Sequence, residues 1–226
     1  MSVLYVYAVL RARPRGALPR GLAGEPLRLV GGGGLLAAVG ALPHAPAPTA
    51  AALRAHDRTV RRLAARADAV LPARFGTLVA GPAALRARLE PRADALRRAL
   101  AFVAGREQMT LRVYGARRAD GLAPTGRASG APAAGAGTRY LEARRRARAV
   151  VEIAPLRPAL AGIVIAERVE RHDRPPLLAS LYHLVRRGDG ARYRRAITRA
   201  RRALAGVRVR ASGPWPPYAF ADEALP

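Results

Sequence analysis

The residues that could carry acid–base or metal chemistry are few and widely separated in this sequence. The histidines are His44, His56, His172 and His183, and no two of them have the H-x-x-x-H spacing of a helical metal site. His56 is followed by Asp57, but adjacent residues on a helix point in different directions, so we do not expect a catalytic dyad. His183 lies in an apolar segment, where a packed and hydrogen-bonded histidine is the ordinary finding. The histidines therefore indicate neither a catalytic nor a metal site.

Nucleophiles and phosphate-binding motifs are also missing. The chain has no cysteine, which excludes thiol catalysis, disulfides and cysteine-ligated metals. No serine lies in a G-x-S-x-G elbow. The glycine run 31–34 is not followed by a helix carrying Lys or Ser/Thr, so we expect a hairpin turn and not a phosphate loop. Ion pairing with the abundant arginines is the expected role of four acidic residues, Glu25, Asp68, Glu90 and Asp94. The sequence thus predicts no enzyme, no cofactor and no metal.

The formal charge of +25 suggests a nucleic-acid or anionic-membrane partner, because clustered basic groups release counterions from phosphates. All forty basic residues are arginine, however, and they lie on nearly every segment, which is typical of a GC-rich genome. Tyr5, Tyr7, Arg112 and Tyr114 lie on predicted strands without an RNP-like motif, so we expect the tyrosines to be core residues. An arginine-rich nucleic-acid-binding protein remains the second hypothesis.

Membrane insertion and export are not expected. No stretch approaches the roughly 18 to 20 apolar residues of a membrane span. Residues 1–10 lack the charged start and the cleavage context of a signal peptide, and are predicted to form a strand. We expect a cytoplasmic protein that does not contact a membrane.

The first part of the chain shows strand patterns and then a helix. Residues 4–10 are apolar at both parities, as in a strand buried on both faces, and 27–30 and 35–39 flank the glycine run like a hairpin. An amphipathic helix of about twenty residues follows, with Thr49 as its N-cap. Its apolar face consists of Leu53, His56, Val60, Leu63, Ala67 and Val70.

The next segments continue the mixture of strands and helices. Residues 70–78 are predicted as a strand or extended connection. A second helical region starts near Pro82, restarts at Pro91 and ends at Gly105. Residues 107–115 alternate as a half-buried strand. This order predicts an α+β sandwich whose helices cover one face of a mostly antiparallel sheet, with a ferredoxin-like arrangement as the simplest match.

The composition changes after this unit. Residues 116–137 are rich in Ala, Gly, Pro and Arg and have no apolar period, so they are predicted to be an exposed linker. A long helix is predicted from about Thr138 until Pro155. Residues 160–170 fit a helix or a strand, and a helix is slightly favoured. Residues 177–185 are predicted to be an apolar strand.

A helix and a strand complete the second unit. The helix presents one apolar face, formed by Tyr193, Ile197, Ala200 and Leu204. The strand covers 207–211. We therefore predict a ferredoxin-like N-terminal domain at 1–115, a flexible linker at 116–137 and a C-terminal α+β domain at 138–226 that ends in an aromatic and proline-rich tail.

Three motifs carry a resemblance to a known family: LPARFGTL at 71–78, GREQMTLRVYG at 105–115 and, above all, GPWPPYAF at 213–220. Together they resemble the gas vesicle protein F/L family (GvpF/GvpL). Further segments follow in the family's order: LYVYAVL, GLAGEPLRLV, AALRAHDRTV and RYLEARR. The resemblance covers essentially the whole chain.

The sequence departs from the family pattern at three positions. The family usually has Ser where Ala219 stands, often has an aromatic residue near Gln108, and frequently has an apolar residue such as Met where Ala73 stands. These departures weaken the case for a specific contact of Ala219 or Gln108.

The resemblance implies a gas vesicle accessory protein with an N-terminal ferredoxin-like α/β domain and a C-terminal α+β domain. It implies binding to the hydrophobic shell protein GvpA and to other accessory proteins, in vesicle nucleation and assembly or as a minor structural component. It implies a location at gas vesicles in the cytoplasm, and no catalytic residue, cofactor or metal.

The terminal motif is also informative in physical terms. Its prolines fix φ and remove N–H donors, so residues 213–217 cannot continue the preceding strand as an interior strand, and we expect the segment to leave the sheet. Its aromatic residues either clamp the fold, which we favour, or contact a partner directly. The candidate structural or partner-contact residues are Arg74, Phe75, Gly76, Trp215, Pro216, Pro217, Tyr218 and Phe220.

Overall fold

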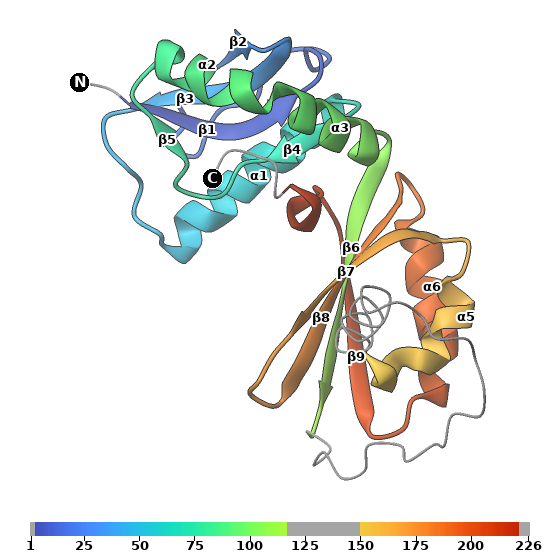
Figure 1. Ribbon diagram of the computed structural model, residues 1–226. Helices are drawn as coiled ribbons and strands as arrows, with labels where there is room; N and C mark the ends of the chain where they lie inside the picture. The colour runs from blue at the N-terminus through green and yellow to red at the C-terminus, as the bar shows by residue number, and fades with distance from the viewer. Residues whose placement is uncertain (1–2, 117–149, 222–226) are drawn as a thin grey trace, which may run out of the picture. The chain divides into compact units, whose positions relative to one another are not determined.

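The computed structural model describes residues 3–116 and 150–221 of the chain, and these divide into two compact units (Figure 1). Unit 1 comprises Met1–Gln108, Leu184–Gly188 and Gly213–Pro226, and unit 2 comprises Met109–His183 and Asp189–Ser212. The α+β class with two units is therefore as predicted. The predicted linker lies outside the described residues except for Ala116, as does the start of the predicted long helix.

The division differs from the predicted domains in two places. The strand predicted to end the N-terminal domain belongs to unit 2 from Met109 onward. The described part of the terminal motif, predicted to end the C-terminal domain, belongs to unit 1. The physical reason for the second difference is packing, because Phe220 is buried and Tyr218 packs against the core of unit 1.

The sheet of unit 1 has the strand order β2-β3-β1-β4, and β5 also pairs with β1. All its pairings are antiparallel, and in the register Tyr5 lies opposite Gly40 and Ala8 opposite Pro72, with an irregularity between Val6 and Ala8. The strands are β1 Val3–Leu10, β2 Leu27–Gly32, β3 Leu35–Leu42, β4 Val70–Pro72 and β5 Leu78–Val79. Strand β1 therefore has partners along both edges.

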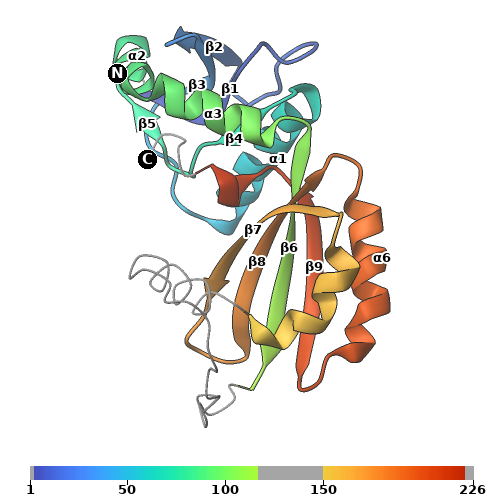
Figure 2. The same cartoon turned by 45° about the vertical axis from the view of Figure 1, so that its right-hand side comes forward.

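Helices cover both faces of this sheet (Figures 1 and 2). On one face, Val60 and Leu63 of α1 (Ala50–Arg66) join Tyr5 and Tyr7 in one core cluster. On the other face, Gly32 approaches α2 (Pro82–Leu89), which is followed by η1 (Glu90–Arg92) and α3 (Ala93–Val103). The expectation of helices on one face was thus too simple. The cause is the double-sided apolar pattern of β1, which needs a covering layer on each side.

The starts and stops of these helices follow local rules that the sequence displays. Thr49 is the N-cap of α1, and its Oγ1 accepts a hydrogen bond of 3.1 Å from the Ala52 amide. Pro91 lies in η1, where it separates α2 from α3, and Gly105, with φ of 63°, follows the end of α3. Both breaks were predicted.

The four-stranded sheet, most of whose residues belong to unit 2, has the order β7-β8-β6-β9. Its strands are β6 Arg106–Gly115, β7 Val164–Arg171, β8 Leu177–Arg186 and β9 Val207–Trp215. The helical segments of unit 2 are η2 Val151–Leu156, α5 Arg157–Leu160, α6 Gly190–Ala200 and η3 Arg201–Ala203. Strand β9 lies at the end of this order, where a proline such as Pro214 is tolerated, so the strand continues to Trp215 and the prediction that residues 213–217 leave the sheet is wrong for its first three residues.

The prediction of a helix through 160–170 is wrong. The helix α5 ends at Leu160, and Gly162 adopts a φ of 72°, which suits the residue just after a helix. The β-branched residues that follow, such as Val164 and Val169, then favour the strand β7. Within the described residues, no helix is both long enough and apolar enough to span a membrane.

The glycine run forms the predicted hairpin turn between β2 and β3. Gly33 and Gly34 have φ values of 58° and 72°, which L-residues with side chains rarely adopt. Arg97 Nη2 donates to the Gly33 carbonyl oxygen at 2.9 Å, and Arg86 Nε donates to the Gly31 carbonyl oxygen at 3.1 Å. A Cβ at Gly33 would lie 2.8 Å from the Ala93 Cβ, whereas one at Gly34 would meet only the guanidinium of Arg97. The turn is therefore shaped to let α3 approach.

This geometry predicts that the two turn glycines differ in tolerance. Gly34→Ala should lower the free energy of unfolding by about 1–2 kcal/mol, the cost of a left-handed conformation. Gly33→Ala has the same cost and adds the clash with Ala93, so it should destabilise the protein more. Urea unfolding of both variants checks this, and equal losses would contradict the close approach of α3.

Candidate partner-contact site

Both groups of predicted motif residues belong to unit 1. The first group lies in the loop between β4 and β5, where Arg74 is exposed and its carbonyl oxygen accepts a hydrogen bond of 2.8 Å from the Thr77 hydroxyl. The second group forms the end of β9 and the short helix η4 (Tyr218–Phe220), which packs next to β4. The fold therefore brings the two motifs, far apart in sequence, to the same part of unit 1.

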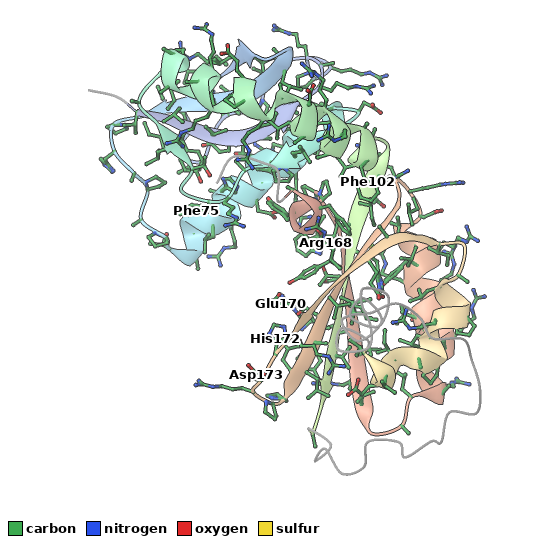
Figure 3. All side chains as sticks on the ribbon, in the orientation of Figure 1. Phe75, Phe102, Arg168, Glu170, His172 and Asp173 are labelled. Atoms are coloured by element: carbon green, nitrogen blue, oxygen red, sulfur yellow. The ribbon has the colours of Figure 1, made fainter. Side chains whose placement is uncertain are left out.

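Phe75, which is labelled in Figure 3, and Gly76 complete an aromatic cluster around the buried Tyr5 and His56. The Phe75 ring meets the rings of Tyr5 and His56 edge-on, with centroid distances of 6.1 and 5.8 Å. The Gly76 amide donates to the Tyr5 hydroxyl at 3.1 Å, and that hydroxyl lies 2.9 Å from Nδ1 of His56. Since the hydroxyl accepts from Gly76, it donates its own proton to His56. The loop after β4 is thus fixed by a polar group inside the core.

A second buried hydroxyl holds the loop before β2. Tyr7 donates to Oε1 of Glu25 and accepts a hydrogen bond of 2.7 Å from the Leu22 amide. Oε2 of Glu25 accepts from the Ala23 amide at 3.0 Å. The predicted ion pair of Glu25 is therefore replaced by a bond to a tyrosine and to its own loop. Nothing in the local sequence signals this contact, because Tyr7 and Glu25 meet only through the fold.

The terminal motif is attached to α1 through Asp57. The hydroxyl of Tyr218 donates to Oδ1 of Asp57 at 3.1 Å, and Arg61 Nε donates to Oδ2 at 2.7 Å. The guanidinium of Arg61 stacks on the ring of Trp215, 3.9 Å from its centroid. Pro216 and Pro217 are buried beside this group. Asp57 and His56 point to different partners, as predicted for neighbours on a helix.

The end of the motif is held by α3 and β6. The Ala219 amide donates to Oε1 of Gln108 at 2.8 Å, and the ring of Phe220 lies 6.3 Å from that of Phe102. Ala219 and Gln108 are therefore in direct contact, although both positions depart from the family pattern. The contact uses the backbone of Ala219, so it does not depend on which side chain stands there.

Burial shifts the ionisation of this cluster. It raises the pKa of Tyr5 to about 12 and raises the pKa values of Tyr7 and Tyr218 as well, because a charged phenolate is poorly solvated in the core. Desolvation also lowers the pKa of His56 from its ordinary value of 6.5, against a smaller opposing effect of the Ala73 backbone. The cluster is therefore neutral at neutral pH and acts as core and not as an acid–base site.

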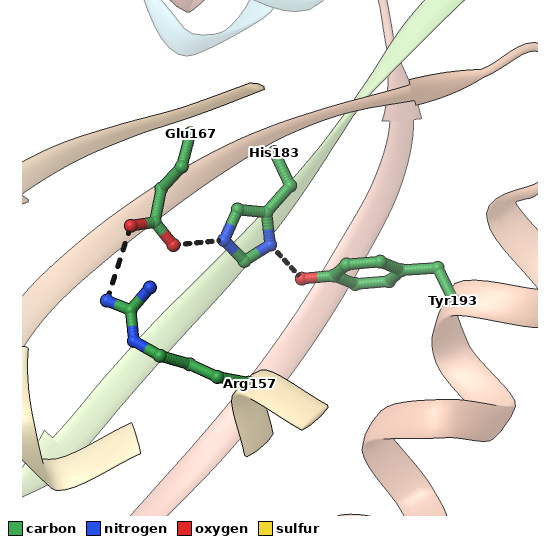
Figure 4. A network of polar contacts seen from close by, with 4 residues as sticks. All are labelled: Arg157, Glu167, His183 and Tyr193. Carbon is green, nitrogen blue, oxygen red and sulfur yellow. Dashed lines mark hydrogen bonds and ion pairs between the residues drawn. The ribbon is translucent and has the colours of Figure 1, made fainter. Parts of the chain in front are cut away.

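A polar network lies inside unit 2 (Figure 4). His183 is fully buried, its Nε2 donates to Oε2 of Glu167 at 2.8 Å, and its Nδ1 lies 2.6 Å from the Tyr193 hydroxyl. Arg157 Nη2 pairs with Oε1 of Glu167 at 3.5 Å. The hydrogen bond from His183 is the main cause of a lowered pKa of Glu167. This is the packed and hydrogen-bonded histidine that the apolar segment predicted.

No metal site appears in the described ranges, where no three His, Asp or Glu side chains gather to hold an ion. The predicted ion pairs of Asp68 with Arg11, at 3.4 Å, and of Asp94 with Arg97 are present. The features that stand out are thus not catalytic groups but a terminal segment and a loop fixed on a rigid α/β unit. They place the chain in the class of α+β proteins built on two antiparallel sheets.

Comparison with known proteins shows which family of this class is concerned. The family model described as "Gas vesicle synthesis protein GvpL/GvpF" matches residues 3–222. The chain belongs to this family. Gas vesicle protein L of Streptomyces sp. (strain CB03234) is 33% identical over 253 aligned residues, covering 97% of this chain and 93% of that protein.

Solved structures of the family have the same fold. The crystal structure of gas vesicle protein GvpF from Microcystis aeruginosa aligns with a TM-score of 0.74 at 15% identity, covering 97% of this chain and 99% of that one. GvpF from Anabaena sp. PCC7120 aligns with a TM-score of 0.72 at 16% identity, covering 98% and 97%. The α+β fold is therefore shared at low sequence identity.

The contacts of the terminal motif predict that it stabilises unit 1. Phe220 is 4% exposed, so Phe220→Ala should lower the free energy of unfolding by about 3–5 kcal/mol. Ala219→Ser in the same segment keeps the backbone hydrogen bond to Gln108, so it should change the free energy of unfolding by less than about 0.5 kcal/mol. Chemical unfolding measures both, and an unaffected Phe220→Ala variant would show that the motif does not clamp the fold.

The buried histidine predicts a pH dependence of stability. Below pH 6.5 the unfolded chain binds a proton at His56 that the folded chain excludes, so stability should fall as the pH falls. The slope of this contribution is at most about 1.4 kcal/mol per pH unit. His56→Gln should remove this part of the slope, and His44→Gln, at an exposed site, should keep it. Equal slopes in wild type and His56→Gln would contradict a neutral His56.

Proposed function

We propose that this protein binds the hydrophobic shell protein of the gas vesicle, GvpA, and assists nucleation and growth of the vesicle wall. The observation that carries the proposal is the match to the gas vesicle synthesis family over residues 3–222. It acts at gas vesicles in the cytoplasm, together with other accessory proteins, and not as an enzyme.

The physical basis of the proposal is the problem that the shell subunit poses. A protein with a large exposed apolar surface aggregates unless that surface is covered until it reaches its place in an assembly. A helper therefore needs a rigid surface with aromatic anchors. In unit 1 the terminal motif meets this need, since Trp215 is half-buried and is held by Arg61 while Pro214 next to it is exposed.

The described residues give no support to the nucleic-acid hypothesis. Base stacking on a sheet needs exposed aromatic rings among basic residues. Tyr5 and Tyr7 are fully buried, so strand β1 offers no such platform. The remaining argument for nucleic acid is the net positive charge of the chain, which attracts any polyanion without selecting one.

The test is a binding experiment with purified shell protein under vesicle-forming conditions. We expect the immobilised chain to retain the shell protein, also at moderate salt. In a sedimentation assay, less shell protein should pellet when the chain is present than when it is absent. Duplex DNA is the comparison, because its binding should fall steeply with salt. Absence of shell-protein retention, or retention of DNA alone, would overturn the proposal.

A further inference from the structure

Two hollows in unit 1 lie beside the end of α1. The first, of about 390 Å³, has apolar walls that include Ala64, Val70, Val103 and the terminal motif from Pro214 to Pro217. The second, of about 220 Å³, lies next to it and is polar. The two share Ala65, Asp68 and Arg187 in their walls, so they lie side by side, and the pair is called the groove from here on.

The first hollow is held open by contacts within unit 1. Arg61 is fixed between Asp57 and the ring of Trp215, and Arg187 Nη2 donates to the Ala67 carbonyl oxygen at 3.1 Å. Glu107 Oε1 accepts from the Gly188 amide at 3.2 Å. A volume in this range suits an apolar ligand group, and walls that are already ordered lose little entropy on binding.

The second hollow is strongly basic. Its walls contain five arginines and one aspartate: Arg11, Arg13, Arg15, Arg66, Arg187 and Asp68. Arg13 and Arg15 are exposed. An arginine guanidinium binds a carboxylate through two parallel hydrogen bonds, so several arginines around one hollow favour carboxylates.

We propose that this groove binds a segment of a partner protein in which apolar side chains are followed by acidic ones. The apolar side chains fill the hollow beside Trp215, and the carboxylates meet Arg13 and Arg15. That the partner is a gas vesicle protein rests on the proposed function; the chemistry of the segment rests on the groove.

Two other occupants fit the groove less well. A nucleic acid would place phosphates in the first hollow too, where the walls are mostly apolar and Glu107 repels them, and one face of Trp215 is already covered by Arg61. A second copy of the chain would bring a net charge of +25 against the same arginines. Charge and apolarity together therefore select an acidic, apolar protein segment.

The chain carries its own reporter for this test, because Trp215 is its one tryptophan. The probe is a synthetic peptide in which leucines precede a run of glutamates, and the matched control peptide has arginines in place of the glutamates. We expect the acidic peptide to shift the fluorescence of Trp215 in a saturable manner and the basic peptide to have no effect.

Variants that leave the core intact locate the binding. Ala65 is exposed on α1 and lines both hollows, so Ala65→Phe fills the groove, and Arg13→Glu with Arg15→Glu cancels the net positive charge of the second hollow. Each should weaken peptide binding by about tenfold or more. Arg54→Glu with Arg58→Glu makes the same charge change at exposed sites of α1 outside the groove, and should bind nearly as wild type does. Circular dichroism verifies that each variant is folded.

Three results would overturn the inference: no fluorescence change with the acidic peptide, unchanged binding by Ala65→Phe, or tighter binding of a single-stranded oligonucleotide in the same groove. The shell protein separates this inference from the proposed function. If it binds wild type and Ala65→Phe equally, the groove is not its contact and the proposed function stands. If it binds neither while the peptide binds wild type alone, the proposed function fails and the groove stands.

Discussion

The architecture of unit 1 depends on two tyrosine hydroxyls that strand β1 carries into the core. Tyr5 and Tyr7 are fully buried, and a buried hydroxyl without a hydrogen-bond partner costs about 1–3 kcal/mol. The fold supplies those partners from distant parts of the chain: Gly76 and His56 for Tyr5, and Leu22 and Glu25 for Tyr7. The loops before β2 and after β4 therefore have their shapes because β1 is buried on both faces.

The terminal motif is also held by hydrogen bonds to a residue of α1. Asp57 lies on the helix turn that contains His56 and accepts hydrogen bonds from both Tyr218 and Arg61. Arg61 in turn covers Trp215. One helix thus presents His56 to the inner cluster and Asp57 to the motif, and so connects the buried strand to the surface that the motif forms. A rigid interior is what keeps the wall of the groove in place.

Local patterns predicted the elements well, because the forces that set them act over a few residues. The N-cap Thr49, the restart at Pro91, the stop at Gly105 and the glycine hairpin all depend on backbone conformations that one residue type favours. The strand β7 was missed because a short apolar run fits a helix or a strand equally, and its pairing with β8 decides between them.

The arrangement of the candidate site could not be predicted in the same way. The motif GPWPPYAF was found from its composition, but its contacts with Asp57, Arg61, Phe102 and Gln108 join residues more than a hundred positions apart in sequence. Only the fold brings them together. The predicted division of the chain into domains differed from the observed one for the same reason, because the terminal motif belongs to unit 1.

The excess of arginine has a structural consequence that a count of charges does not reveal. With 15 carboxylates for 40 basic residues, the acidic groups are too few to pair one to one with the arginines, and several arginines of the described residues donate to carbonyl oxygens. Such bonds fix the hairpin turn through Arg86 and Arg97 and the end of α1 through Arg187.

A bond from a guanidinium to a carbonyl needs no titrating partner, and it is less sensitive to salt than an exposed ion pair, because only one of its groups carries a full charge. The positive charge is thereby kept while the fold gains contacts. Arginines that close turns in this way are committed to the fold. At the groove, Arg187 is held in this way, whereas the exposed Arg13 and Arg15 close no turn in the described residues, and it is these two that leave a local basic surface to meet a partner.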